Sequence, residues 1–217
     1  MSKYILKFEK DDCVKFVSHL DIIRVFDRAM RRAGLPMGYS AGFNPHPLMT
    51  FAHPLGVGVA SCGELVEITT SEYIEPQVFK EKLNEKMPQG FIVSDIKEIE
   101  GKNNFANLKS ADYAIKIEGE FPKEGLEVFF KTLTEIKVNK KTKRGITETD
   151  IKPFVLEFKE ISKGMLNVRL KAGAENLKPE LLIEGLKKYI PSFKTERVLI
   201  LRTQLLDQNG EPLFVVG

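Results

Sequence analysis

Strands and amphipathic helices follow the same order twice along this chain of 217 residues. In the first half, residues 3–9 alternate between apolar and polar side chains, as a half-buried strand does. A short second strand piece is predicted at residues 13–17. Further strands are predicted at residues 48–52, 64–70 and 91–99, and helices at residues 19–33 and 76–87. The predicted order in this half is therefore strand, helix, strand, strand, helix, strand.

The second half repeats this order. Strands are predicted at residues 112–118, 153–161, 165–171 and 196–203, and helices at residues 123–134 and 178–189. The turn Ser162-Lys163-Gly164 separates the two middle strands. This order is that of a ferredoxin-like unit. We therefore predict an α+β protein made of tandem ferredoxin-like (βαββαβ) units with antiparallel sheets.

Polar, glycine-led residues 101–110 are predicted to be the linker between the two units. The first unit is expected to span residues 1–100, and the second unit residues 111–217, with an inserted basic loop at 137–147. In such a unit two helices pack on one face of the sheet. The other face is expected to remain available for RNA, a second domain or another subunit.

Helix 19–33 carries a row of arginines. Ser18 and Asp21 form an approximate capping box at its start, and Gly34 ends it. Its apolar face is predicted to bury Leu20, Ile22, Ile23, Phe26, Ala29, Met30 and Ala33. Four arginines lie at helical spacing, namely Arg24, Arg28, Arg31 and Arg32. An ordinary solvated face, supported by an Asp27–Arg31 pair, is one interpretation. The other is a phosphate-binding row, because the planar guanidinium suits phosphate oxygens.

A second basic cluster falls in the inserted loop and comprises Lys137, Lys140, Lys141, Lys143 and Arg144. A basic hairpin is a common means of contacting a phosphate backbone. A solvated loop without a binding role is the alternative. The net charge of +3 permits a polyanionic partner without requiring one.

The segment Gly42-Phe43-Asn44-Pro45-His46-Pro47 combines two prolines with polar side chains. Proline disfavours the helical region for the residue before it, so Asn44 and His46 are expected in extended backbone. Phe43 and the nearby Tyr39 offer aromatic faces on which a base or another planar ligand could stack. The sequence therefore predicts recognition by Asn44 and His46. A structural clasp that ties this loop to helix 19–33 is the competing hypothesis.

Conventional catalytic and metal motifs are absent from the sequence. His19, His46 and His53 lack the short spacings of a metal site, so neither a metal nor a cofactor is predicted. Cys13 and Cys62 are expected to be reduced structural thiols. General acid catalysis by His19 or His46 stays open as an alternative. The chain has no long apolar run and no signal-peptide pattern at its start, so we expect a cytoplasmic protein without membrane contact.

The run FVSHLDIIRVFDRAMRRAGLPMGYSAGFNPHP, followed by Pro54-Leu55-Gly56-Val57-Gly58, resembles the radical-SAM-linked family known as DUF2344, a domain of unknown function. Members of that family occur fused to, or encoded beside, a radical SAM protein. The resemblance therefore implies an accessory to a radical enzyme. This chain has no CxxxCxxC triad and cannot ligate the radical SAM cluster alone. The doubled ferredoxin-like layout is also similar to that of CRISPR-repeat processing endoribonucleases.

Taken together, these features predict a non-catalytic accessory module that binds RNA or an RNA-containing particle, such as a ribosomal particle, for a radical SAM partner. Its predicted binding residues are Arg24, Arg28, Arg31, Arg32, Tyr39, Phe43, Asn44, His46, Lys141, Lys143 and Arg144. A metal-independent endoribonuclease that uses His19 or His46 is one alternative. A protein–protein adaptor without nucleic acid is the other.

Overall fold

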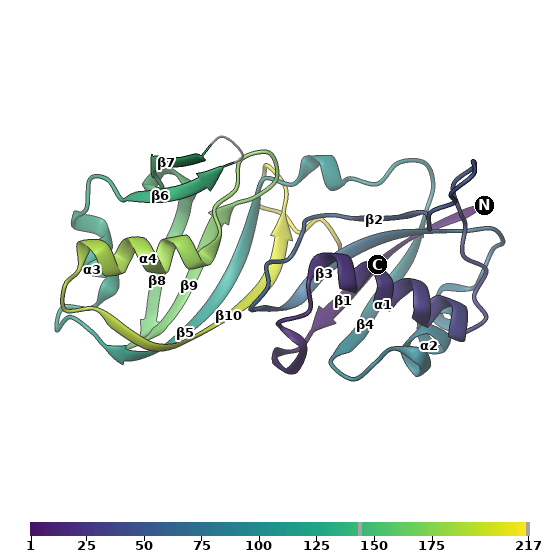
Figure 1. Cartoon of the computed structure of the whole chain (residues 1–217), viewed down its shortest axis with the longest axis horizontal. Coiled ribbons are helices and arrows are strands. Elements are labelled where there is room, and N and C mark those ends of the chain that lie inside the picture. The colour runs from purple at the N-terminus through teal and green to yellow at the C-terminus, as the bar shows by residue number, and fades with distance from the viewer. Residues whose placement is uncertain (143–144, 216–217) are drawn as a thin grey trace. The chain divides into compact units, whose positions relative to one another are not determined.

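The computed structural model describes residues 1–142 and 145–215, and the chain divides into two compact units (Figure 1). The first unit contains Met1–Leu108 together with the residues from Glu211 onward, and the second is Lys109–Gly210. Both units follow the order strand, helix, strand, strand, helix, strand, with a hairpin inserted in the second. The predicted α+β class with ferredoxin-like units is confirmed.

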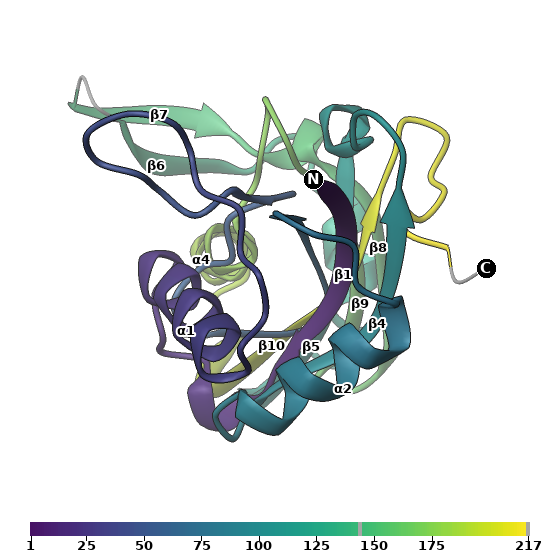
Figure 2. The ribbon, with the colours of Figure 1, turned by 90° about the vertical axis from the view of Figure 1, so that its right-hand side faces the viewer.

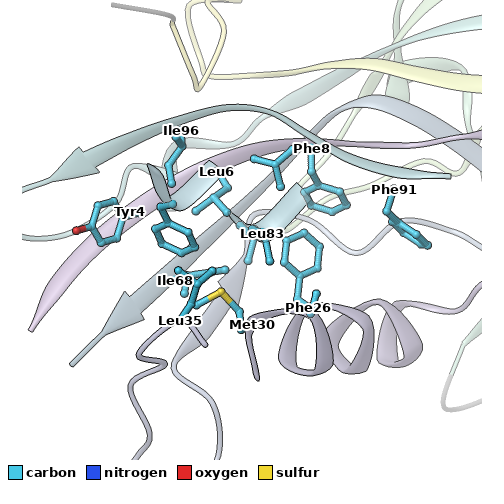
Figure 3. Packing of buried hydrophobic residues seen from close by; sticks show 14 of the residues in the cluster. Tyr4, Leu6, Phe8, Phe26, Met30, Leu35, Ile68, Leu83, Phe91 and Ile96 are labelled. Atoms are coloured by element: carbon cyan, nitrogen blue, oxygen red, sulfur yellow. The ribbon is translucent and has the colours of Figure 1, made fainter. Parts of the chain in front are cut away.

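The first unit packs two helices on a four-stranded sheet. Its elements are β1 (Ser2–Lys10), α1 (His19–Arg32), β2 (Met49–Phe51), β3 (Val59–Thr70), α2 (Pro76–Lys86) and β4 (Phe91–Ile99). The strands lie in the order β4-β1-β3-β2, and every neighbouring pair is antiparallel. Helices α1 and α2 lie side by side (Figure 2). The helix-facing core joins α1 and α2 to β1, β3 and β4 (Figure 3).

The apolar face of α1 is narrower than its sequence predicts. Ile22, Phe26, Ala29 and Met30 are buried, as expected. Leu20 is instead 66% exposed, because it lies in the first turn, beyond the edge of the sheet-facing stripe. The buried positions recur at spacings of four and three, which is one side of a helix. The opposite side of α1 is therefore turned to solvent.

The second unit has the same strand order. Its elements are β5 (Ser110–Glu120), α3 (Leu126–Thr132), β6 (Lys137–Thr142), β7 (Gly145–Asp150), β8 (Val155–Ser162), β9 (Met165–Lys171), α4 (Pro179–Tyr189) and β10 (Lys194–Leu206). The sheet order β10-β5-β9-β8 places the fourth strand beside the first and the third beside the second, as in the first unit. Strands β6 and β7 form a separate antiparallel hairpin.

The β6–β7 hairpin lies along α4 (Figure 1), and a glycine of α4 lies at the contact between them. A Cβ atom at Gly185 would lie 2.6 Å from Cγ2 of Ile136 and 3.2 Å from side-chain atoms of Val138 and Ile151. All three of these hairpin-base side chains are buried. The Lys137 N–H also donates to the hydroxyl of Tyr189 at 3.0 Å. The base of the inserted hairpin is therefore packed against α4.

Residues 13–17 do not form the predicted strand. Asp12–Val14 is a short 3₁₀ helix whose N-cap is Asp11. The buried ammonium of Lys10 donates to the carbonyls of Lys15 and Val17 at 2.7 and 2.9 Å. These bonds satisfy carbonyls that a strand neighbour would otherwise have to pair, so this segment turns back towards the end of β1.

Helix α3 is shorter than the predicted helix 123–134. It starts at Leu126, where the Glu160 carboxylate accepts hydrogen bonds from the N–H groups of Leu126 and Glu127 at 2.6 and 3.3 Å. Its N-cap residue, Gly125, has φ of 85°, a conformation that favours glycine and is not helical. The tertiary contact with β8 therefore sets the start of this helix.

The sheet face opposite the helices is partly covered in the first unit, although we expected it to be available. Glu67 lies between two core residues of β3 and so points to this face. Its carboxylate accepts a hydrogen bond from the side-chain amide of Asn103 at 2.7 Å. The Asn104 amide donates to the carbonyl of Leu213 at 2.9 Å, and the ammonium of Lys97 lies 5.4 Å from the centre of the Phe214 ring.

The segment expected to be a linker, residues 101–110, contributes to this cover. It contains the 3₁₀ helix Phe105–Asn107, and Phe105 and Leu108 are buried. The residues from Glu211 onward, which we expected in the second unit, group with the first. Two chain segments therefore add apolar side chains to the first unit beyond its six core elements.

We expect Gly185→Val to destabilise the second unit by about 1–3 kcal/mol, because the new methyl groups overlap Ile136. The melting temperature, followed by circular dichroism, should fall by about 2–4 °C per kcal/mol. Gly185→Val should cost less in an Ile136→Ala background, because the truncated side chain leaves room for the new methyl groups. The control is Glu184→Ala at the neighbouring exposed position, which should change stability by less than about 0.5 kcal/mol. A Gly185→Val protein as stable as the control would contradict the packing of the hairpin on α4.

Candidate nucleic-acid interface

Helix α1 starts with a reciprocal cap that orients its first arginine. The Ser18 hydroxyl accepts from the N–H of Asp21 at 3.3 Å and donates to its carboxylate at 2.7 Å. Arg24 then contacts the other carboxylate oxygen at 2.8 Å. The Ser18 hydroxyl, followed by the Arg24 guanidinium, lowers the pKa of Asp21 below its usual value. Asp21 is therefore an anion throughout the neutral range, and it holds Arg24 against the first turn.

Three arginines form an exposed row on the solvent side of α1: Arg24, Arg28 and Arg31. Arg24 is paired with Asp21, and Nε of Arg31 lies 3.1 Å from the carboxylate of Asp27. Arg28 makes neither a hydrogen bond nor an ion pair with any residue that the structure describes. Since a paired guanidinium must exchange its carboxylate for a phosphate, Arg28 is the cation of the row that is most readily available to a ligand.

Arg32 lies outside this row. Its Nη2 donates to the backbone carbonyl of Lys86 at 2.5 Å, at the last residue of α2. Helix C-termini carry partial negative charge and unpaired carbonyls, so a cation there stabilises the helix. This geometry gives Arg32 a role in joining α1 to α2.

Tyr39 connects the arginine row to the loop that follows. Its hydroxyl donates to the Asp27 carboxylate at 3.3 Å, and the Arg31 guanidinium carbon lies 5.7 Å from the ring centre. Its backbone forms an isolated β-bridge with Pro47. One carboxylate, Asp27, thus contacts both the helix row and the first residue leading into the loop.

Residues 40–47, which we call the recognition loop, are closed at their base by backbone hydrogen bonds. The Ser40 N–H donates to the carbonyl of His46 at 2.9 Å, and the His46 N–H donates to the Ser40 hydroxyl at 2.9 Å. Just outside the loop, the N–H of Leu48 donates to the Gly38 carbonyl at 2.9 Å. Gly42 turns the chain with φ of 119°, which favours glycine. The loop ends are fixed by backbone groups and one serine, without the side chains of Asn44 or His46.

The predicted recognition side chains of this loop are exposed. Phe43 has a relative exposure of 111%, and Asn44 and His46 are also exposed. Within residues 1–142 and 145–215, the side chains of Asn44 and His46 form no hydrogen bonds. The Phe43 ring makes no contact with another aromatic ring in this part of the chain. In particular, neither polar side chain is bonded to Ser18 or Asp21, so this geometry supports presentation of the side chains over a clasp to α1.

The two histidines of the catalytic alternative have different surroundings. His19 is half-buried, and its ring packs edge-on against Phe51 at 5.1 Å between ring centres. His46 is exposed at the closed base of the recognition loop. Within the described residues, no three His, Cys, Asp or Glu side chains lie close enough together to hold a metal ion. The two histidines therefore lie in different environments, one packed against an aromatic ring and one open to solvent.

In the inserted hairpin, the lysines with described side chains contact neighbours in the second unit. The Lys137 ammonium lies 2.7 Å from the Glu135 carboxylate, which raises the pKa of this lysine. The Lys140 ammonium donates to the Asn176 carbonyl at 3.3 Å. The backbone of Lys141 pairs with Ile146, while Lys143 and Arg144 lie outside the described residues.

The sequence did not predict the closure of the recognition loop by Ser40 or the contact between Asp27 and Tyr39. Ser40 closes the recognition loop, and Asp27 contacts Tyr39 as well as Arg31. The spacing of four residues predicts the Asp27–Arg31 pair. No sequence signal points to the contact between Asp27 and Tyr39, because it depends on how the chain folds back after α1.

These features define an α+β protein of tandem ferredoxin-like units, with an arginine row on one helix beside a proline-framed loop. The chain belongs to the family described as "Uncharacterized protein conserved in bacteria (DUF2344)", which matches residues 3–179. No curated protein matches the sequence. No helix among the described residues is long and apolar enough to cross a membrane.

Two solved structures are similar over most of the chain. One is a chain of the "Crystal Structure of a Cbf5-Nop10-Gar1 Complex", with 10% identity and a TM-score of 0.47. The alignment covers 93% of this chain and 48% of that one, so this protein spans about half the length of its neighbour. The other is an unknown protein from Galdieria sulphuraria, with 11% identity, a TM-score of 0.27, and coverage of 93% and 98%. Likenesses this distant carry no functional conclusion.

We expect Asn44→Ala and His46→Ala to leave the melting temperature of the first unit unchanged, because both side chains are exposed and without partners in the described structure. Ser40→Ala should lower it, since the hydrogen bond from the His46 N–H is removed. One such bond contributes about 0.5–1.5 kcal/mol, and each kcal/mol shifts the midpoint by about 2–4 °C. Thermal melts of the three variants test this. A decrease in Asn44→Ala as large as that in Ser40→Ala would mean that the loop is a structural clasp.

Proposed function

We propose that this protein is a non-catalytic module that binds RNA, through the arginine row and the recognition loop, for a radical SAM partner enzyme. The observation that carries the proposal is Arg28, an exposed guanidinium without a described partner, flanked by two further arginines on one helix face. Guanidinium groups bind phosphate oxygens in a bidentate manner, and they remain charged at all physiological pH values. The proposed partner rests on the resemblance of residues 16–47 to the radical-SAM-linked family.

The contact made by Tyr39 supports a single continuous surface. Because Tyr39 contacts Arg31 with its ring and pairs with Pro47 through its backbone, the row and the loop are neighbours within the first unit. An RNA strand whose phosphates contact α1 is therefore within reach of Phe43, Asn44 and His46. In this scheme the arginines neutralise phosphates, while Asn44 and His46 contact the polar edges of bases.

A binding role is favoured over the ribonuclease alternative. An acid–base mechanism requires a proton donor and acceptor within about 3 Å of the reacting atoms. His19 instead packs on Phe51, in a half-buried position. RNA recovered after incubation with the protein should therefore keep its full length on a denaturing gel. Shortened RNA, which no longer appears with His46→Ala or His19→Ala, would favour the nuclease instead.

We expect Arg28→Ala to weaken RNA binding and to reduce its salt dependence. Removal of one phosphate-binding group should lower the slope of log K against log salt concentration by about 0.7 for a single strand. Fluorescence anisotropy over a series of salt concentrations measures this slope. Arg32→Ala is the matched control, since Arg32 is bonded to the end of α2 and should leave the slope unchanged. Equal slopes for Arg28→Ala and the unaltered protein would exclude the row from the interface.

The basic hairpin is proposed as a second phosphate-binding segment. Replacing Lys141, Lys143 and Arg144 together with Ala should lower the same slope by up to about 0.7 for each phosphate that the variant no longer binds. Lys137→Ala serves as the control within the hairpin, because its ammonium is paired with Glu135. If the triple variant and Lys137→Ala bind RNA with the same affinity and salt dependence, the hairpin does not contact the RNA. The RNA-binding surface is then confined to the first unit.

Co-purification from the native host tests the partner. An affinity-tagged full chain should retain both a radical SAM protein and RNA, and nuclease treatment should release the RNA. Retention of the enzyme with no nucleic acid, before or after crosslinking, would support the adaptor alternative.

A further inference from the structure

We infer that the bound nucleic acid is single-stranded and that one of its bases stacks on Phe43. This inference rests on the proposed function and specifies its ligand. It depends on three features: the exposure of Phe43 in the recognition loop, the engagement of the other nearby aromatic residue, and the short length of the arginine row.

The recognition loop exposes one aromatic face at a fixed place. Phe43 follows Gly42 within a loop whose two ends are held by the reciprocal bonds between Ser40 and His46. Its exposed fraction, 111%, is the highest of any large apolar side chain among the described residues. Because full burial of such a ring contributes about 1.5–3 kcal/mol, the fold gains little from placing phenylalanine here. A ligand that covers the ring recovers that contribution.

Tyr39 cannot supply a second stacking face. The Arg31 guanidinium lies 5.7 Å from its ring centre, and its hydroxyl is bonded to Asp27. Tyr39 is also only partly exposed. Phe43 is therefore the aromatic ring of this surface that remains open to a base.

One exposed aromatic ring beside a short row of cations fits a single-stranded nucleic acid. At 1.5 Å of rise per residue, the row from Arg24 to Arg31 spans about 10 Å, enough for only a few phosphates. In a duplex the bases are stacked on one another, and the deep groove of A-form RNA excludes side chains. In a single strand a base can turn out of the stack and pack on an aromatic ring while its neighbouring phosphates remain on the helix.

The test uses short oligoadenylates with the full chain: a single-stranded RNA, a single-stranded DNA, the RNA in a duplex, and an RNA in which abasic sites replace the adenines. We expect Phe43→Ala to weaken binding of the single-stranded RNA by roughly 5- to 150-fold, the range for removal of one base–aromatic stack. Phe43→Trp should bind at least as tightly as the unaltered protein. The control is Phe16→Ala, since Phe16 is also well exposed, at 72%, but precedes α1 and lies outside the loop.

The abasic RNA separates stacking from charge. If Phe43 contacts a base, the abasic RNA should bind the unaltered protein at least as weakly as oligoadenylate binds Phe43→Ala, because the base contacts of Asn44 and His46 are lost as well. With the abasic RNA, Phe43→Ala should cause no further decrease in affinity. Such non-additivity is the signature of a direct contact. The duplex should bind more weakly than the single strand at equal salt. Comparison of RNA with DNA shows whether the ribose hydroxyl contributes.

Failure of this inference is distinguishable from failure of the proposed function. Binding that depends on Arg28, with no effect of Phe43→Ala or with equal affinity for the duplex, overturns the stacking inference and leaves the proposed function standing. Absence of binding to every probe overturns both. Release of a protein partner by Phe43→Ala, with RNA binding intact, would reassign Phe43 to a protein interface and also overturn the inference.

Discussion

The packing of Phe26 on the sheet is the contact on which the candidate site depends. Its ring lies edge-on to Phe8 at 4.9 Å and to Phe51 at 5.8 Å between ring centres. Each such pair adds about 0.5–1.5 kcal/mol beyond the area it buries. Because these three rings fix the rotation of α1 about its axis, the row from Arg24 to Arg31 is held on the solvent side. The same Phe51 ring also packs against His19.

The net charge of the α1 surface is smaller than its number of arginines, because two of them are paired with carboxylates. Asp21 and Asp27 each pair with one arginine of α1, and Arg32 is bonded to α2. Ion pairs at exposed positions contribute little to stability, about 0–1 kcal/mol. They can still set the direction of a guanidinium and reduce the potential that a phosphate meets. The proposed interface is thus one of modest charge, and Arg28 is the member of the row that has no ion pair among the described residues.

The same strand order supports different additions in the two units. In the first unit, the connection between α1 and β2 is long enough to form the recognition loop. In the second unit, the corresponding connection contains the β6–β7 hairpin, whose base packs on α4 at Gly185. A ferredoxin-like sheet tolerates both because its core is made by the faces of the elements, and connections between them remain at the surface.

The sequence by itself determined the element order, the start of α1 at its Ser18 cap and the exposure of the arginine row, because these follow from residue periodicity and local capping. Local patterns also placed β4 and β9 at their observed residues. The tertiary structure alone decided the rest. Lys10 turns residues 13–17 away from strand pairing, and Glu160 sets the start of α3. Asp27 joins Arg31 to Tyr39. Each of these contacts joins groups whose meeting depends on the course of the folded chain, and no spacing rule in the sequence encodes that course.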